Sequence, residues 1–324
     1  MTFAIKVEKH GPPEVMQYVD VDIGSPINDQ VRIDHTVIGV NFIDTYFRSG
    51  LYPINLPSGL GGEAAGVIKE LGTEVENFKL GDRVAYVSPP PSNSYSQSTI
   101  IDSKKLIKLP DDIDDKTAGA LFLKGLTSWY LLRKTFVPKK GDYILLYAAA
   151  GGVGLIMSQW ARYLGLKVIG VVSTEEKKKL ALENGCCDVL LFGENIVEAV
   201  KSITNGLGVS VVYDPIGKDT LYDSLDCLRP KGLLVSYGNA SGVIDCLPIL
   251  ELLKRGSLYV TRPTLWSYIK ERKDFEEGCE ELFNLVRKKV ITARIGQSFP
   301  LEKAIDAHHA LERRQTKGST ILIP

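Results

Sequence analysis

The sequence predicts an α/β protein that combines a doubly wound parallel sheet of six strands with a second, mostly β lobe. Three observations support this fold class. Residues 141–164 have the pattern of a buried strand, a turn of small residues and a helix. Strand-like apolar runs then alternate with helical stretches up to Arg262, as in a parallel sheet. Residues 1–120 instead contain short alternating runs interrupted by Gly and Pro, which is typical of antiparallel strands.

The first lobe is expected to contain short strands joined by irregular turns. The clearest candidates are Phe3–Val7, Gln30–Asp34, Gly66–Ile68 and Arg83–Val87, and Pro89–Ser94 is expected to be a loop. From Asp111 the pattern becomes helical, a helical run from Asp115 continues through Lys134, and Pro138 then ends it. The central parallel sheet begins soon afterwards.

Six apolar runs predict the strands of the parallel sheet. They are Tyr143–Tyr147, Lys167–Val172, Val189–Leu191, Val209–Tyr213, Gly232–Tyr237 and Ser257–Thr261. Helices between most of them predict right-handed crossovers. The sheet and its helices are expected to form one domain at residues 123–262.

The tail after Arg262 is short for a domain of its own. It contains an amphipathic helix, a short apolar segment, a second helix and a final strand, at Phe275–Val286, Ile291–Ile295, Leu301–Leu311 and Ser319–Ile323. We therefore expect it to return to the first lobe, so that residues 1–122 and 263–324 form one discontinuous domain.

Composition excludes several classes of protein. The 39 basic side chains balance the 39 acidic ones, which gives no electrostatic reason to expect nucleic acid or an anionic membrane as partner. A hydrophobic fraction of 44% and a charged fraction of 24% are typical of a soluble globular protein. No run approaches the roughly eighteen apolar residues of a membrane span, and the first residues lack a signal-peptide core. The cytoplasm is the expected location.

Cysteine and histidine are poorly arranged for disulfides or metals. The five cysteines show no repeated spacing and no C-x-x-C pair, at Cys186, Cys187, Cys227, Cys246 and Cys279. Only four histidines are present. The pair His308 and His309 lies in a helical stretch, and we expect it at the surface rather than in a metal site.

The turn after the strand Tyr143–Tyr147 partly matches G-x-G-x-x-G. Gly151 and Gly154 occupy its second and third positions, and Ala149 replaces the first glycine. The pattern alone fits either a packing turn or a phosphate site, in which pyrophosphate sits on a helix N-terminus. Because a second strand ends in Ser173 about twenty residues later, where a ribose-binding residue belongs, the context favours a dinucleotide.

The end of that second strand predicts which dinucleotide binds. NAD-selective sites place Asp or Glu there, whereas this chain has Ser173 and Thr174, followed by Lys177. Hydroxyl groups and a lysine suit a 2′-phosphate, although Glu175 and Glu176 weaken the local positive field. NADPH is therefore the expected cofactor.

Seven stretches, in order along the whole chain, resemble one family. They are Gly39–Pro53, Pro57–Gly66, Gly81–Val84, Lys124–Thr127, Ala148–Gly154, Val212–Gly217 and Tyr259–Pro263. They resemble the quinone oxidoreductase, or zeta-crystallin-like, branch of the medium-chain dehydrogenases/reductases. The resemblance implies a GroES-like lobe, a Rossmann domain that binds NADPH, an active site between them, and a homodimer formed through the edge strand 257–261.

The resemblance also implies that no zinc is bound. Zinc alcohol dehydrogenases of the superfamily have metal ligands near the positions of Asn41, Gly62 and Lys124, and none of these three residues suits zinc. Residues 87–98 also lack the cysteines of a structural zinc loop. Without a Lewis acid, the substrate must hold the negative charge itself, as quinones and conjugated carbonyls do.

Site residues follow from the resemblance. Asn41, Tyr46, Tyr52 and Thr127 are expected at the nicotinamide end, where they orient the reactants, and Tyr46 or Tyr52 could alternatively polarise or protonate the acceptor. Asp214, by its place at the end of a predicted strand, is expected to organise its loop or to cap the helix of Asp219 rather than to act in catalysis. Besides Asn41, Tyr46 and Thr127, the expected cofactor-binding residues are Gly151, Gly152, Val153, Gly154, Ser173, Thr174, Lys177, Phe192, Ile216, Tyr237, Gly238, Asn239, Val260, Arg262 and Lys317.

The sequence thus predicts an NADPH-dependent, zinc-independent quinone reductase that acts on a small quinone or conjugated carbonyl. An NADPH-dependent enoyl or 2-alkenal double-bond reductase on the same scaffold is the close alternative. The resemblance also leaves open an NADPH-binding crystallin-like or RNA-binding protein. The zero net charge and the absence of a basic patch with interleaved aromatic residues argue against a strong nucleic-acid surface.

Overall fold

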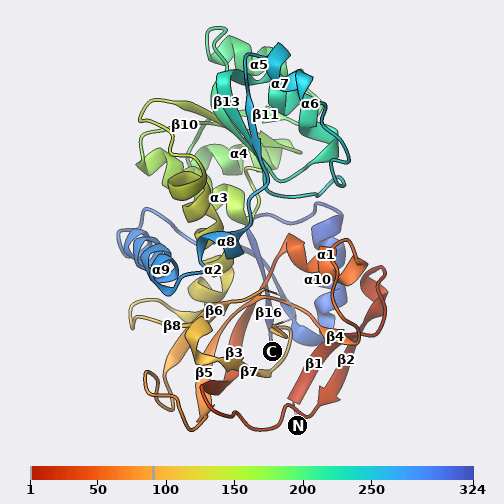
Figure 1. Cartoon of the computed structure of the whole chain (residues 1–324), viewed down its shortest axis with the longest axis vertical. Helices are drawn as coiled ribbons and strands as arrows, with labels where there is room; N and C mark the ends of the chain where they lie inside the picture. The colour runs from red at the N-terminus through yellow and green to blue at the C-terminus, as the bar shows by residue number, and fades with distance from the viewer. Residues whose placement is uncertain (1, 90–91) are drawn as a thin grey trace. The chain divides into compact units, whose positions relative to one another are not determined.

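The computed structural model describes residues 2–89 and 92–324, and the chain divides into two compact units (Figure 1). Unit 1 comprises Met1–Lys124, Cys279–Arg287 and Thr292–Pro324, and unit 2 comprises Gly125–Gly278 and Lys288–Ile291. Two long helices contribute to both units, α2 (Asp115–Tyr130) and α9 (Arg272–Arg287). The predicted loop Pro89–Ser94 lies partly outside the described residues.

Unit 1 is built on two sheets that are mostly antiparallel. The larger sheet has the order β15-β16-β3-β5-β6-β8, with β7 also paired to β3, and the smaller has the order β2-β1-β4. The strands of the larger sheet are β3 (Gln30–Val40), β5 (Glu63–Leu71), β6 (Arg83–Val87), β7 (Ser98–Asp102), β8 (Leu106–Lys108), β15 (Ile295–Pro300) and β16 (Ser319–Ile323). Those of the smaller sheet are β1 (Thr2–Val7), β2 (Met16–Val21) and β4 (Ser58–Gly59).

The core of unit 1 lies against the large sheet and two helices. Along β3, Val31 and Ile33 are buried while Arg32 and Asp34 are partly exposed, as the two-residue period of a half-buried strand requires. The helices α1 (Phe42–Ser49) and α10 (Ala304–Glu312) contact each other beside this sheet (Figure 1). Short 3₁₀ turns complete the unit at η1 (Pro13–Val15), η2 (Ser103–Lys105) and η5 (Leu301–Lys303).

Unit 2 contains a six-stranded sheet in which every pair of neighbouring strands is parallel. In spatial order the strands are β11 (Cys186–Leu191), β10 (Lys167–Val172), β9 (Tyr143–Tyr147), β12 (Val209–Asp214), β13 (Leu228–Ser236) and β14 (Tyr259–Thr261). Its helices and turns are η3 (Leu131–Thr135), α3 (Gly152–Tyr163), α4 (Glu175–Glu183), α5 (Ile196–Ile203), η4 (Lys218–Thr220), α6 (Leu221–Asp226), α7 (Leu250–Lys254) and α8 (Leu265–Tyr268). The parallel sheet and the separate, mostly β unit confirm the predicted fold class.

The strand order creates a switch point in this sheet. From β9 the chain moves outward through β10 and β11, and then returns to β12 on the other side of β9. The loops that follow β9 and β12 therefore leave in opposite directions along the sheet. A crevice opens between such loops at the carboxyl ends of the strands, which is where ligands of doubly wound proteins bind.

Several features of unit 1 differ from the sequence-based expectation or are absent from it, among them the strands β2, β7 and β8. The helix α1 was not predicted, although its residues belong to a recognised motif. Strand β15 begins at Ile295, where the expected apolar segment ends. The surface prediction for His308 is wrong, because its side chain is fully buried, whereas His309 is partly exposed and contacts Glu14 at 2.8 Å.

No helix within the described residues is long and apolar enough to cross a membrane.

Candidate functional site

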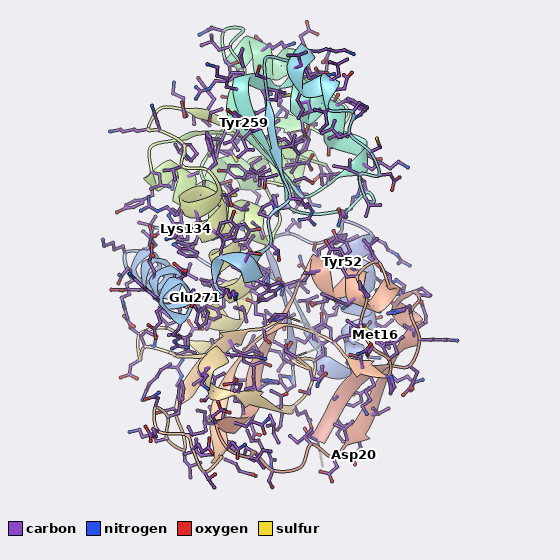
Figure 2. All side chains as sticks on the ribbon, viewed as in Figure 1. Met16, Asp20, Tyr52, Lys134, Tyr259 and Glu271 are labelled. Carbon is purple, nitrogen blue, oxygen red and sulfur yellow. The ribbon has the colours of Figure 1, made fainter. Side chains whose placement is uncertain are left out.

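The segment that follows β3 holds three of the predicted site residues. Asn41 is the N-cap residue of α1, and its backbone N–H donates to Asp44 Oδ2 at 2.8 Å. Gly50 is the C-cap residue that follows the helix, and its φ of 85° is costly for any other residue. The rings of Tyr46 and Tyr52 meet edge to face with centroids 5.2 Å apart, and Tyr52 is labelled in Figure 2. The structure therefore brings the rings of Tyr46 and Tyr52 together and places Asn41 at the start of the helix that carries Tyr46.

A buried carboxylate fixes the orientation of the Asn41 amide. Glu63, at the start of β5, has no exposed surface. Its Oε2 accepts from Asn41 Nδ2 at 2.8 Å and from Lys124 Nζ at 3.2 Å, and its Oε1 accepts from the N–H of Leu123 at 2.7 Å. Because Nδ2 donates to Glu63, the side-chain carbonyl oxygen of Asn41, which can only accept, faces away from this carboxylate.

Sequence reasoning gave Glu63 no role in the site, and it placed Lys124 in a family motif and at a position where it cannot bind zinc. The available signal was a lone glutamate within the small, apolar run of residues 59–66. A charged residue in such a run is buried and must be paired.

Lys317 lies on the loop that leads into β16. Since Thr320 of β16 pairs with Val40 of β3, this loop lies at the same end of the sheet as Asn41. The structure thus places Lys317 on the same side of unit 1 as the Asn41 segment.

In unit 2 the turn after β9 is shaped by close backbone contacts. Ala148 adopts a left-handed φ of 54°, and its carbonyl oxygen accepts from the N–H of Gly151 at 2.9 Å. A Cβ on Gly154 would lie 2.3 Å from that oxygen, so no larger residue fits there without a shift of the backbone. Gly154 is thus required by packing, and Ala148 is a strained residue that sequence reasoning did not identify.

The N-terminus of α3 differs from those of the next two helices. Thr174 caps α4 and Asn195 caps α5 through side-chain oxygens, whereas the N-cap residue of α3 is Gly151, which has no side chain. The bare first turn leaves its N–H groups accessible to an anion, and the helix dipole favours negative charge there. A pyrophosphate fits these residues.

The ends of β10 and β11 lie on the same edge of the sheet as this turn. Ser173 and Thr174 are exposed, and Lys177 Nζ lies 3.4 Å from Ser173 Oγ. Phe192 follows β11 and is 45% exposed, so it is not a core residue. A positive charge and two hydroxyl groups therefore stand one strand away from the bare turn.

Hydrogen bonds to Asp214 hold the loop that follows β12. Asp214 is buried at the end of β12 and accepts from the N–H of Ile216 at 2.7 Å, while burial raises the pKa of its carboxyl group. It also accepts from Gly217, Thr220 and Ser224. The predicted structural role of Asp214 is confirmed.

A backbone bond places Ile216 beside the residues that follow β13, because the N–H of Ser241 donates to its carbonyl oxygen at 2.8 Å. The N–H of Tyr237 donates to the Asp214 carbonyl oxygen at 2.8 Å, and a Cβ on Gly238 would lie 2.3 Å from the Pro215 carbonyl oxygen. Asn239 continues the same loop.

Val260 lies on β14 and Arg262 follows it, at the same carboxyl edge of the sheet. Thr127 lies on α2 and is largely buried.

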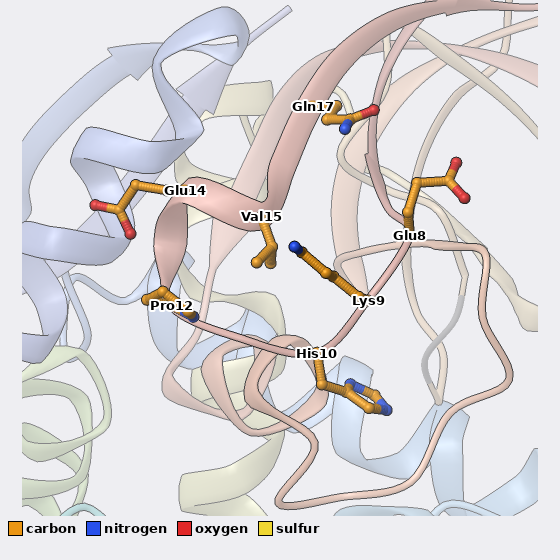
Figure 3. Close-up of a pocket in the computed structure, with 7 residues that line it drawn as sticks. All are labelled: Glu8, Lys9, His10, Pro12, Glu14, Val15 and Gln17. Carbon is orange, nitrogen blue, oxygen red and sulfur yellow. The ribbon is translucent and has the colours of Figure 1, made fainter.

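A separate pocket on unit 1, of about 590 Å³, lies away from the predicted residues (Figure 3). Its lining residues are Glu8, Lys9, His10, Pro12, Glu14, Val15 and Gln17. Because its charged groups have both signs, it has no clear preference for phosphate. No predicted site residue lines it.

Across residues 2–89 and 92–324, no group of three or more His, Cys, Asp or Glu side chains is arranged to hold a metal ion.

Two protein-family models match the chain. The model described as "Alcohol dehydrogenase GroES-like domain" matches residues 27–111, and the model described as "Zinc-binding dehydrogenase" matches residues 152–284. The first match falls within unit 1, and most of the second falls within unit 2.

Individual proteins resemble the chain over its whole length. A protein of Pseudomonas aeruginosa named "Quinone oxidoreductase" is 47% identical, with 100% of both chains covered. The crystal structure of Escherichia coli quinone oxidoreductase complexed with NADPH superposes with a TM-score of 0.97 at 47% identity, covering 99% of this chain and 100% of the other. A Burkholderia protein named "2-haloacrylate reductase" is 46% identical, with 100% of this chain and 99% of that one covered.

Two alanine substitutions separate packing from anion binding in the turn after β9. Gly154→Ala places a Cβ 2.3 Å from the Ala148 carbonyl oxygen, so we expect a loss of stability of about 2 kcal/mol or more. Gly151→Ala meets the same oxygen at 3.2 Å, so stability should change little while the new methyl group obstructs the predicted phosphate position. Thermal unfolding and NADPH titration measure the two effects. A Gly151→Ala variant that binds NADPH like the wild type would contradict the predicted site.

Proposed function

The chain belongs to the quinone oxidoreductase branch of the medium-chain dehydrogenase/reductase superfamily, and from this premise we propose that it is an NADPH-dependent quinone reductase. The observation that carries the proposal is 47% identity, over the full chain, to proteins named quinone oxidoreductase, one of them solved with NADPH. The bare turn after β9 and the hydroxyl and lysine groups after β10 supply independent support.

Each set of residues then has a proposed task. Gly151–Gly154 hold the pyrophosphate through backbone N–H groups, and Ser173, Thr174 and Lys177 hold the 2′-phosphate. Asn41, Tyr46, Tyr52 and Thr127 orient the nicotinamide end and the acceptor. When bound, NADPH supplies a hydride from C4 of its nicotinamide ring.

We further propose that the reaction needs no zinc. At the position of the third zinc ligand of related dehydrogenases stands Lys124, whose ammonium group contacts Glu63 at 3.2 Å. Asn41 uses its amide nitrogen for the same carboxylate. A quinone suits such a site, because the charge that it gains on reduction is delocalised onto its own oxygen atoms.

A second candidate function is reduction of an activated carbon–carbon double bond. It is favoured by 46% identity, over the full chain, to the protein named 2-haloacrylate reductase. Such an acceptor also carries a conjugated carbonyl group that holds the charge.

The cytoplasm is the location that we propose for either activity, because all five cysteines are free thiols.

An acceptor panel tests the proposed function. We expect NADPH to be oxidised with benzoquinone or naphthoquinone at least about tenfold faster than with a 2-alkenal or 2-haloacrylate, since at 25 °C a preference of ~1.4 kcal/mol in the barrier gives this ratio. The rate should be unchanged after dialysis against a chelator. Turnover of the alkene alone would favour the second candidate, and loss of activity on chelation would contradict the zinc-free mechanism.

Lys177 provides a test of cofactor choice. Lys177→Gln removes the positive charge beside Ser173, so we expect NADPH to bind about tenfold more weakly, with NADH binding unchanged. Lys179→Gln is the matched control, because Lys179 is exposed on the same helix. If both variants lose the same affinity, the effect is general electrostatics rather than contact with the 2′-phosphate.

We propose that the protein is a homodimer joined through the edge strand β14. This strand ends the sheet, and two of its three residues expose apolar surface: Tyr259, labelled in Figure 2, is 61% exposed and Val260 is 38% exposed. The neighbouring α7 exposes Leu250 and Leu253. Exposed apolar edges are normally covered, and a second copy of the strand would do so across a two-fold axis.

Charge on the edge strand should weaken this dimer. Tyr259→Lys is expected to convert the protein to a monomer in size-exclusion chromatography with light scattering, because the buried lysines would repel each other. Tyr163→Lys, on the exposed face of α3, is the matched control and should stay dimeric. A monomeric wild-type protein would contradict the proposal.

A further inference from the structure

A chain of buried polar side chains connects α10 to the start of α1. Arg48 Nη1 lies 3.0 Å from His308 Nδ1, His308 Nε2 lies 3.1 Å from Tyr95 Oη, and Tyr95 Oη lies 3.0 Å from Asp44 Oδ2. Each of the four side chains is at most 2% exposed. All four belong to unit 1, and the contact between α1 and α10 is visible in Figure 1.

The chemistry of Arg48 sets the direction of every bond in this chain. A guanidinium group only donates, so His308 Nδ1 must accept and the ring proton must be on Nε2. That proton is donated to Tyr95 Oη, whose own proton is therefore directed at Asp44. Burial, with a smaller effect of the Arg48 charge, lowers the pKa of His308 to about 3, which keeps the ring neutral as this direction requires.

We infer that Arg48, His308 and Tyr95 are positioning residues for Asn41: the hydrogen bonds that they direct at Asp44 hold its carboxylate on the backbone N–H of Asn41. The inference rests on the proposed function, in which Asn41 contacts the nicotinamide end of NADPH. Asp44 Oδ2 receives both the Tyr95 proton and the Asn41 N–H, the latter at 2.8 Å. Displacing the carboxylate therefore moves the residue that contacts the cofactor.

The charge state of Asp44 determines how strongly it holds Asn41. Burial raises the pKa of its carboxyl group to about 7, against the bonds from Asn41 and Tyr95 and the charge of Lys124, which lower it, while Glu63 raises it. Its Oδ1 is buried and has no hydrogen-bond partner among the described residues. The carboxylate is the stronger acceptor, so NADPH affinity should decrease as the pH falls through neutrality.

The charged groups next to His308 and Arg48 are themselves paired. His309, the neighbour of His308 on α10, contacts Glu14 of η1 at 2.8 Å. Arg48 pairs with Glu312 of α10 at 2.5 Å and donates to the Gly11 carbonyl oxygen at 3.1 Å. Arg48 thus keeps its charge, and the direction of the chain is fixed from its outer end.

A second buried tyrosine–histidine pair in unit 1 provides a matched control. Tyr86 Oη lies 3.0 Å from His35 Nε2, and His35 Nδ1 lies 2.7 Å from the Ser96 carbonyl oxygen. The carbonyl oxygen requires the proton on Nδ1, so Tyr86 donates to Nε2, and this pair ends at the Ser96 backbone without reaching Asp44. Tyr86→Phe and Tyr95→Phe both remove one hydroxyl group from the core.

The experiment compares NADPH binding to these two variants by nucleotide fluorescence between about pH 6 and pH 9, a range that spans the titration of Asp44. We expect Tyr95→Phe to weaken binding about five- to tenfold and to move the midpoint of its pH dependence upward, because Asp44 loses a donor. Tyr86→Phe should bind like the wild type at every pH. Titration of the 2′-phosphate is common to all three proteins and does not alter the comparison.

Substitutions of His308 provide an independent test. His308→Gln retains one acceptor and one donor without a titratable ring, so it should bind NADPH almost as tightly as the wild type. His308→Leu removes both and should resemble Tyr95→Phe. Equal affinities for Gln and Leu at this position would overturn the inference even if Tyr95→Phe did not fold.

The inference is also overturned if Tyr95→Phe and Tyr86→Phe bind NADPH equally across the pH range and differ from the wild type only in thermal stability. A wild-type protein with no affinity for NADPH contradicts the proposed function instead. In that case the inference is tested by the pH dependence of the free energy of unfolding.

Asp44 has a folded pKa above its unfolded value of about 4, so its stabilising contribution is complete at low pH and is lost as the pH rises through about 7. Asp44→Asn should remove this slope, and Tyr95→Phe should extend it to higher pH. An unchanged slope in Tyr95→Phe overturns the inference.

Discussion

The candidate site in unit 1 depends on one fully buried carboxylate, that of Glu63. An unpaired charge at such a position would destabilise the fold by about 3–5 kcal/mol, which is a large part of the stability of a typical domain. Its partners come from two other segments, the N-cap residue of α1 and the turn of α2 that contains Leu123 and Lys124. Strand β3 also leaves room for this carboxylate, because a Cβ on Gly39 would lie 2.0 Å from Glu63 Oε2. The need to pair this charge therefore fixes where Asn41 and its amide group can lie.

The two units solve different physical problems with different residues. In the phosphate site proposed for unit 2, backbone N–H groups have to be exposed and side chains have to be absent, and the N-cap residue Gly151, which has no side chain, meets this need. In unit 1 polar side chains have to be held in single orientations inside an apolar lobe, and only a network with every donor matched to an acceptor can do so. Glycine motifs therefore mark unit 2, whereas buried charges and hydrogen-bonded rings mark unit 1.

This difference explains which parts could be predicted from the sequence. The strands of unit 2 follow from apolar runs a few residues long, and the parallel sheet then places Ser173, Phe192, Ile216 and Tyr237 at one edge, so the fold and this set of strand ends follow from local pattern. The network of unit 1 does not, because Asp44, Tyr95 and His308 are far apart in the sequence and each has the appearance of a surface polar residue. The prediction for His308 is wrong for this reason: the residue lies in a helix of mixed composition, and only the packing of α10 on α1 shows that its ring is enclosed.

The cluster formed by Glu63, Asn41 and Lys124 also gives a physical reason why the zinc ligands are replaced in this family. A dication bound near Asn41 would have to displace or neutralise the ammonium group of Lys124, since two cations repel strongly where little water is present. Lys124 instead supplies the single positive charge that Glu63 requires, and Asn41 supplies a neutral donor. The balance of charge in the cluster is complete without a metal ion. In the proposed reaction the acceptor must then accommodate its own negative charge, and this requirement favours conjugated acceptors over simple aldehydes and ketones.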